Sequence, residues 1–173
     1  MAATFEFYED NGNPTGNPAK GAIRNPTTQV NWKSTDDINT AFPAAPINAG
    51  ENSMSKYQFG KFTGTFNSIS NVLFAHTAGA LPTNTKLMGA VTSQYQKPTQ
   101  AAVAGLTDMS AVTSIAAGKP AKLSTAGPEG ANPTNTLTAP GYTQYLVTQI
   151  QTTPAALPGD SPSITLTLRY SEN

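Results

Sequence analysis

The chain has 173 residues and a mass of 18.0 kDa, which is enough for one domain with its own hydrophobic core. Its 10 basic and 10 acidic residues cancel, and only 12% of the residues are charged, against roughly 25% in average soluble proteins. This balance argues against a basic nucleic-acid-binding protein, an acidic disordered tail and attraction to an anionic membrane.

Cysteine is absent, so a disulfide framework and a thiolate metal site are both excluded. No run approaches the roughly 18 apolar residues of a membrane-spanning helix. The first residues, Met1 to Glu6, lack the basic and apolar regions of a signal peptide. We therefore expect synthesis in a cytoplasm without export by that route, and no contact with a membrane.

Turn-forming residues are spread along the whole chain, with 14 Gly and 14 Pro. Asn-Pro-Thr occurs three times, beginning at Asn13, Asn25 and Asn132. Proline fixes its own φ and restricts the residue before it, so these tripeptides predict loop corners. The short segments between the corners alternate apolar and polar residues, as strands do.

The first two strands are predicted near the N-terminus. Phe5 and Phe7 alternate with polar or amphipathic neighbours. Thr28, Val30 and Trp32 share one face of a second strand. Both stretches follow the period of two that is typical of a strand with one buried face.

Residues 55–66 carry aromatic side chains in two phases. Tyr57 and Phe59 belong to one phase, and Phe62 belongs to the other. A regular strand cannot place both phases on one face, because a shift of one residue swaps faces. We expect a β-bulge near Gly60 to reconcile them.

Five further strands complete the expected seven or eight. Residues 62–85 contain no charged side chain and are expected to carry one strand into Ile69 and another through residues 72–74. Alternation then predicts strands over 87–95 and 142–150. The clearest pattern is the last, in which one face carries a row of apolar side chains, namely Ile164, Leu166, Leu168 and Tyr170.

Residues 100–118 are the exception, because their apolar spacing predicts a short amphipathic helix that Gly105 weakens. Residues 9–26 and 118–141 are predicted to be extended, irregular arms, and loops of that length are usually functional or ordered by a partner. Deletion of 119–139 is expected to leave the fold intact.

The predicted fold is all-β, a single antiparallel β-sandwich domain over residues 1–173, of jelly-roll or immunoglobulin-like type. Its arms are the extended segments at about 9–26 and 118–141. Sheet edges with so few charges invite pairing with other strands, so we expect a chain that is permanently packed against other chains.

No residue pattern predicts catalysis, a cofactor or a metal site. His76 is the only histidine and has no accompanying nucleophile motif, so we expect it to bond locally or to face solvent. The adjacent carboxylates Glu9 and Asp10, like Asp36 and Asp37, would point to opposite faces of a strand. The segment that begins at Asp10 lacks the ligand spacing of a calcium loop.

Two binding patterns are weighed against structural roles. Aromatic residues interleave with lysines over residues 56–62, as in a single-strand stacking platform, but zero net charge favours an ordinary amphipathic strand. Trp32 and the tyrosines could line a sugar-binding face. For Trp32 we favour a position in the core.

Four segments carry a resemblance to a known class of proteins. They are Ile47–Ser53, Tyr57–Phe66, Tyr145–Ile150 and Ile164–Tyr170, about a sixth of the chain. Together with the absence of cysteine, the abundance of Thr, Asn and Ala, and the shortage of charge, they resemble small virion structural proteins of tailed bacteriophages, of the capsid decoration or cement type.

The resemblance implies a non-enzymatic protein on the capsid surface that stabilises the shell. Its partners would be the major capsid protein and copies of itself, as a homo-oligomer that is often a trimer in such proteins, with no nucleic acid. A tail, collar or baseplate subunit has the same composition and is the first alternative. A carbohydrate-binding β-sandwich is the second, and a depolymerase fragment with carboxylates near His76 is the third.

Overall fold

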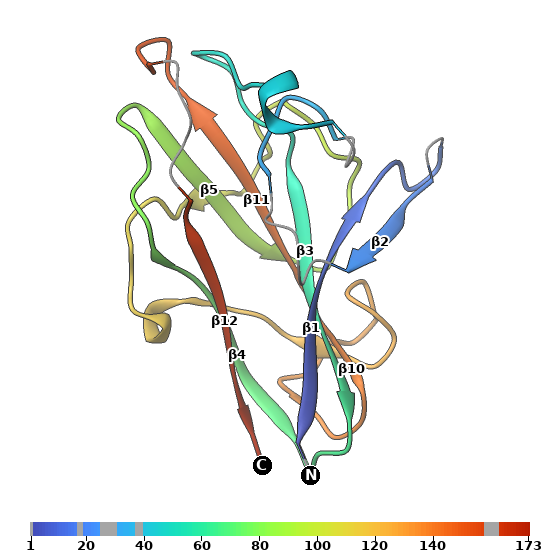
Figure 1. The fold of residues 1–173 in the computed structure, drawn as a ribbon. Helices are drawn as coiled ribbons and strands as arrows, with labels where there is room; N and C mark the ends of the chain where they lie inside the picture. The colour runs from blue at the N-terminus through green and yellow to red at the C-terminus, as the bar shows by residue number, and fades with distance from the viewer. Residues whose placement is uncertain (1, 17–18, 25–30, 37–39, 158–162) are drawn as a thin grey trace.

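The computed structural model describes residues 2–16, 19–24, 31–36, 40–157 and 163–173 (Figure 1). These residues form strands and loops without an α-helix. Their only helical elements are two 3-10 turns, Phe42–Ala44 and Ile115–Ala117. The prediction of an all-β chain with antiparallel sheets is confirmed.

The larger sheet contains eight of the described strands. Their order is β2-β1-β3-β11-β5-β6, with β10 beside β3 and β8 beside β10, and every pair is antiparallel. These strands are β1 (Ala3–Asn11), β2 (Gly21–Arg24), β3 (Lys56–Gly64), β5 (Thr85–Thr92), β6 (Thr107–Asp108), β8 (Leu123–Ser124), β10 (Gly141–Thr143) and β11 (Tyr145–Thr152).

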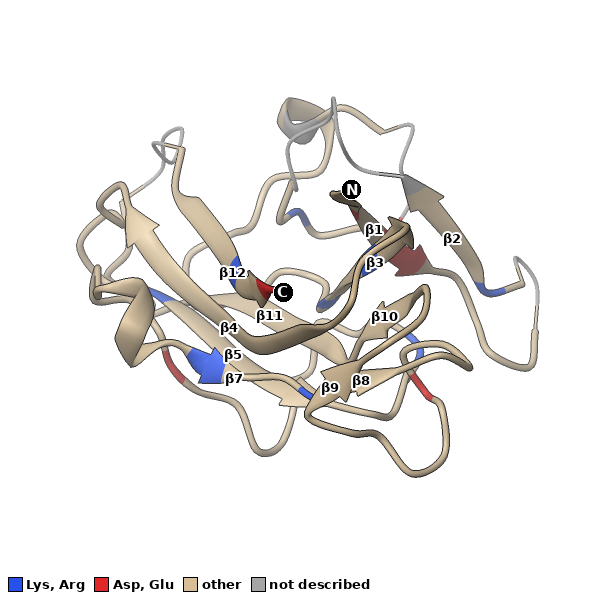
Figure 2. Cartoon of the chain, turned by 90° about the horizontal axis from the view of Figure 1, so that it is seen from below, with Lys and Arg blue, Asp and Glu red and all other residues tan. Residues whose placement is uncertain are grey.

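The smaller sheet contains the four remaining strands that the structure describes, again all antiparallel. β4 lies between β12 and β7 and also pairs with β9. These strands are β4 (Ile69–Ala78), β7 (Lys119–Pro120), β9 (Thr136–Leu137) and β12 (Thr165–Glu172). Charged residues are scattered over the chain, and β4 has none (Figure 2).

One hydrophobic core joins the two sheets. Phe62, Leu87 and Leu146 of the larger sheet and Phe74 of the smaller sheet are each no more than 1% exposed. The rings of Phe7 and Phe74 lie 6.4 Å apart and bridge the two sheets. Burial of such side chains contributes about 1.5–3 kcal/mol each.

The expected bulge near Gly60 is wrong. β1 and β3 pair in continuous register from Ala3 opposite Gly64 to Asp10 opposite Tyr57. The two aromatic phases of β3 lie on its two faces, and both faces are buried. Gly60 is required for packing instead, because a Cβ there would lie 2.4 Å from the ring of Phe5.

The strands predicted over residues 72–74, 87–95 and 142–150 are confirmed with changed boundaries, and the strand predicted through Thr28, Val30 and Trp32 is not. Residues 69–78 form the single strand β4 where two segments were expected, and the predicted strand over 142–150 is divided between β10 and β11. Thr28 and Val30 lie outside the described residues. Trp32 belongs to no strand.

The predicted helix over 100–118 is wrong. Residues 107–108 form β6, which pairs with β5, and the backbone N–H of Met109 donates to the carbonyl of Leu87 at 2.8 Å. Gly105 has φ of +80°, a left-handed conformation that interrupts helical geometry. Tertiary pairing therefore overrides the apolar spacing of this segment.

The expected arms contribute short strands to both sheets. Residues 118–141 contain β7, β8 and β9, and they bury Leu123 and Leu137 at 1% and 2% exposure. The segment 9–26 supplies the end of β1 and all of β2, which pair as a hairpin. Deletion of 119–139 would remove core side chains, so the expectation that it spares the fold is wrong.

Candidate docking surface

An aromatic cluster lies on the face of the larger sheet that points away from the smaller sheet, here called the outer face. Tyr57 and Phe59 of β3, Tyr145 of β11 and Tyr95 from the loop after β5 are all buried. The ring of Tyr145 stands edge-on to Tyr57 at 5.8 Å and to Phe59 at 5.6 Å. Such edge-to-face contacts add about 0.5–1.5 kcal/mol per pair beyond area burial.

Lys20 reaches this cluster from the loop between β1 and β2. Its Nζ lies 4.5 Å from the ring centroid of Tyr95 and 5.3 Å from that of Tyr145, within the range of cation–π attraction. The same ammonium group pairs with the carboxylate of Asp10 at 3.4 Å and with that of Glu129. Lys20 is therefore held by two rings and two carboxylates.

Glu129 connects a second loop to the same place. One of its carboxylate oxygens accepts a hydrogen bond from the backbone N–H of Tyr95 at 3.0 Å, and the other binds Lys20. Two segments more than a hundred residues apart in sequence thus meet over one cluster. We call the surface formed by residues 12–16, 19–20 and 125–131 the paired-loop surface.

The base of the first loop is fixed by buried hydrogen bonds. The carboxylate of Asp10, which is 4% exposed, accepts a hydrogen bond from the hydroxyl of Tyr145. The hydroxyl of Tyr95 donates to the carbonyl of Gly12 at 2.7 Å, and the N–H of Gly12 donates to Asp36 at 3.1 Å. Gly12 has φ of +86°, which glycine adopts without steric cost.

Burial affects the acidity of the three tyrosines in the cluster. Desolvation by burial raises the pKa of Tyr57, Tyr95 and Tyr145. The charge of Asp36 raises the pKa of Tyr95 further, and the hydrogen bond to Asp10 does the same for Tyr145. Their hydroxyls therefore stay protonated near neutral pH.

A second polar network holds the loop after β5 against β11. Gln149 is fully buried, and its side-chain nitrogen donates to the carbonyls of Ser53, Thr99 and Ala101 at 3.0–3.1 Å. Its side-chain oxygen accepts a bond from the N–H of Val103 at 3.3 Å. A satisfied buried network of this kind fixes one arrangement of the chain.

A buried ion pair lies between β1 and β3 on the opposite face. The Nζ of Lys56 is 3.2 Å from a carboxylate oxygen of Glu9 and 3.8 Å from Asp36. Desolvation raises the pKa of Glu9, and attraction to Lys56 opposes this shift. Glu9 and Asp10 do point to opposite faces, as predicted, whereas Asp37 lies outside the described residues.

His76 is buried and forms local hydrogen bonds, which is one of the two roles expected for it. Its Nδ1 lies 3.1 Å from the carbonyl oxygen of Met109, and its Nε2 lies 3.0 Å from that of Ala78. A cavity of about 130 Å³ beside it is also lined by Asp108 and Lys119. Among the described residues that line this cavity, Asp108 is the only carboxylate, and it pairs with Lys86 at 3.2 Å.

The described residues contain neither a group of metal-ligating side chains nor a helix able to span a membrane. In the part of the chain that the structure describes, no group of three His, Cys, Asp or Glu side chains is arranged to hold a metal ion. Nor does any helix in the described ranges have the length and hydropathy needed to cross a membrane.

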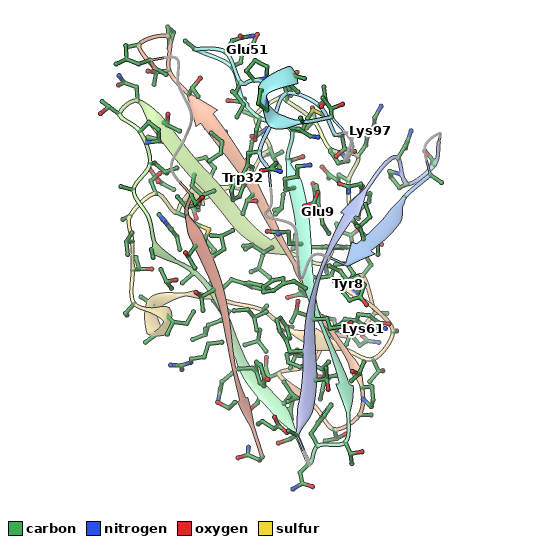
Figure 3. All side chains as sticks on the ribbon, viewed as in Figure 1. Tyr8, Glu9, Trp32, Glu51, Lys61 and Lys97 are labelled. Carbon is green, nitrogen blue, oxygen red and sulfur yellow. The ribbon has the colours of Figure 1, made fainter. Side chains whose placement is uncertain are left out.

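The aromatic residues considered for sugar binding divide into buried and half-buried sets. Trp32 is partly buried against the core, and its indole N–H donates to Thr148 at 3.1 Å. Tyr8 and Tyr142 are half-exposed, and the Nζ of Lys61 lies 5.8 Å from each of their ring centroids. Figure 3 shows Tyr8 and Lys61 close together beside β1 and β3.

The sequence analysis did not single out Lys20, Tyr95 or Glu129. A weak signal existed, because Lys20 is the only charged residue between Asp10 and Arg24. Likewise, Glu129 is the only carboxylate between residues 108 and 160. An isolated charge in a neutral segment is a candidate for a specific partner, but the pairing itself depends on the fold.

No family model, no curated protein and no solved structure matches this chain.

Proposed function

We propose that this chain is a non-enzymatic structural protein of a phage virion, which binds the outer capsid surface as a decoration or cement protein and stabilises the shell. Its partners are then the major capsid protein and further copies of itself. We further propose that the two sheets form a β-sandwich of the jelly-roll or immunoglobulin-like kind, which holds the paired-loop surface in place.

One observation carries the proposal, namely the connection of two distant loops by Lys20 and Glu129. Both loops are rich in Gly and Pro, and most of their described residues are exposed. Ordering a backbone residue costs about 1–2 kcal/mol. A protein that pays this cost within its own fold presents a preorganised surface, which lowers the cost of binding a partner.

The mechanism is physical and needs no reactive group. Each copy contacts the shell through its own preorganised loop surface, and many copies on one lattice act together, so that weak single contacts give strong retention. The shortage of charge fits a permanent contact of this kind, because interface cores are depleted in charged residues.

Quantitative mass spectrometry of purified particles, split into head and tail fractions, tests the location. Hundreds of copies in the head fraction are expected for a decoration protein. A few copies in the tail fraction would instead identify the protein as a tail, collar or baseplate subunit. Absence from both fractions would contradict a virion role.

A matched pair of lysine variants tests the paired-loop surface. Lys20→Met removes the ammonium that joins the two loops and keeps the length of the side chain. Lys61→Met is the control, because it removes a lysine from the same face, over other rings. Co-sedimentation with undecorated shells is expected to fall for Lys20→Met alone, and equal binding by both variants would contradict this surface.

Carbohydrate binding is the second candidate, and the half-exposed group of Tyr8, Tyr142 and Lys61 favours it. Aromatic rings beside a hydrogen-bond donor suit the apolar face of a sugar. This group is small, and the other aromatic residues of the outer face are buried. Binding on a glycan array that is lost in Tyr142→Ala would support this candidate over shell decoration.

A further inference from the structure

β12 has one partnered edge. It pairs with β4 from Thr165 to Glu172, and no strand in the described residues pairs with its other edge. An eight-residue edge of this kind presents a row of backbone N–H and C=O groups to another strand.

The apolar row of β12 is incompletely covered. Leu166, Leu168 and Tyr170 point toward the core but remain half-exposed. The equivalent residues of β11, Leu146 and Ile150, are 1% and 7% exposed. A strand added beside β12 would extend the sheet and cover this row.

The usual protections of an edge strand are weak here. β12 contains no lysine and no proline, and Arg169 is its only basic residue. Two register shifts interrupt its pairing, next to Leu166 and between Arg169 and Ser171. In both shifts the extra residue lies on β4, so β12 itself stays regular and suited to pairing.

We propose that two copies of this chain associate through β12, which pairs antiparallel with β12 of the partner about a two-fold axis at Thr167. In this register Leu166 lies opposite the partner's Leu168, and Thr165 lies opposite the partner's Arg169. Apolar residues then meet on the core side of the sheet, and polar residues meet on the other side.

Parity, charge and space each argue against one other register. A shift of the axis by half a residue would place core-facing residues opposite outward-facing ones. An axis at Arg169 would set two arginines directly opposite each other, which is destabilising. An axis at Leu168 would extend the pairing to Glu172, whose carboxylate already accepts a hydrogen bond from the N–H of Ala3 at 2.8 Å.

The inference specifies the self-association named in the proposed function, and it does not depend on shell binding. It is tested on the isolated full chain. Failure of β12 pairing would therefore leave the decoration role standing, and failure of shell binding would leave the dimer standing.

Cysteine cross-linking tests the axis directly, because the natural chain has no cysteine. Thr167→Cys places two thiols across the axis, with Cα atoms about 4.5–5.5 Å apart, which is within disulfide range. Thr77→Cys is the control, since Thr77 touches Thr167 at 2.6 Å but lies on β4, about 14 Å from its own copy at a strand spacing of about 4.8 Å. Oxidation should yield a covalent dimer of Thr167→Cys only.

Charge substitution at the same position gives an independent readout by light scattering on a sizing column. The wild-type chain should elute as a dimer, and Thr167→Lys and Thr167→Glu should each elute as monomers. A mixture of the two variants should recover the dimer, which a folding defect cannot explain. A wild-type monomer or trimer, or a dimer that persists in Thr167→Lys, would overturn the proposal.

Discussion

β11 and β12 are both eight residues long, yet they differ in how deeply their side chains are buried. Six of the eight residues of β11 are buried, because β3 and β5 flank it and loops cover its outer face. No residue of β12 is fully buried, although β12 has the clearer alternation of apolar and polar residues. The depth of a strand is therefore set by its neighbours in the sheet rather than by its own sequence pattern.

The two sheets also differ in how completely they are covered, and we propose a different contact for each. The larger sheet is covered on both faces, and its outer face supports the paired-loop surface that we propose for shell binding. The smaller sheet ends in the open edge of β12, which we propose for self-association. One chain can thus hold a shell and a second copy at different places.

The largest expected effect on stability comes from removing the buried ammonium group of Lys56, which lies between β1 and β3. Lys56→Met leaves Glu9 buried without its closest cation, which should cost about 3–5 kcal/mol in the free energy of unfolding. The double variant with Glu9→Gln should recover most of this loss. Urea denaturation measures both, and a double variant no more stable than Lys56→Met would contradict the pairing.

Leucine truncation compares β11 with β12 directly. Leu146→Ala removes a side chain that is 1% exposed and should cost about 2–5 kcal/mol. Leu168→Ala on the half-exposed strand should cost less than half as much. The comparison requires urea midpoints at a protein concentration low enough to keep the chain monomeric, and equal losses would contradict the contrast in coverage.

A smaller effect is expected from a single hydroxyl group. Tyr145→Phe removes the donor to the buried carboxylate of Asp10, which should cost about 1–3 kcal/mol. Tyr170→Phe on β12 is the matched control and should change stability by no more than about 0.5 kcal/mol. Thermal unfolding of the two variants distinguishes them, and a larger loss for Tyr170→Phe would refute the role given to the cluster.

The smallest effect is a dependence on pH. Because burial raises the pKa of Glu9 above 4.5 in the folded protein, the folded state binds this proton more tightly than the unfolded state. The wild type should therefore gain stability relative to Glu9→Gln as the pH falls from neutrality toward 4.5. A stability difference that stays constant over this range would show that the Glu9 pKa is not raised.

The sequence predicted the elements better than their arrangement. Alternation identified β1, β5 and β12, because a strand with one buried and one exposed face alternates apolar and polar residues. It misjudged β3, because a strand buried on both faces carries two aromatic phases that resemble a bulge. It also predicted a helix at 100–118, where pairing with β5 decides the structure.

The candidate site was less accessible to sequence reasoning than the fold. Lys20 and Glu129 are separated by 109 residues, and nothing in the sequence around either residue indicates that the two make contact. The two long segments predicted at 9–26 and 118–141 contain Lys20 and Glu129, which meet in the structure. Their role as strands with short exposed tips, and their connection to each other, depend on three-dimensional packing.

Hydrogen–deuterium exchange on Lys20→Met tests most directly the central claim that two distant loops form one ordered surface. The account predicts faster exchange in residues 12–16, 19–20 and 125–131 together, with β11 unchanged and with neither loop affected in the Lys61→Met control. Exchange that rises in the first loop alone, or in neither loop, would contradict it.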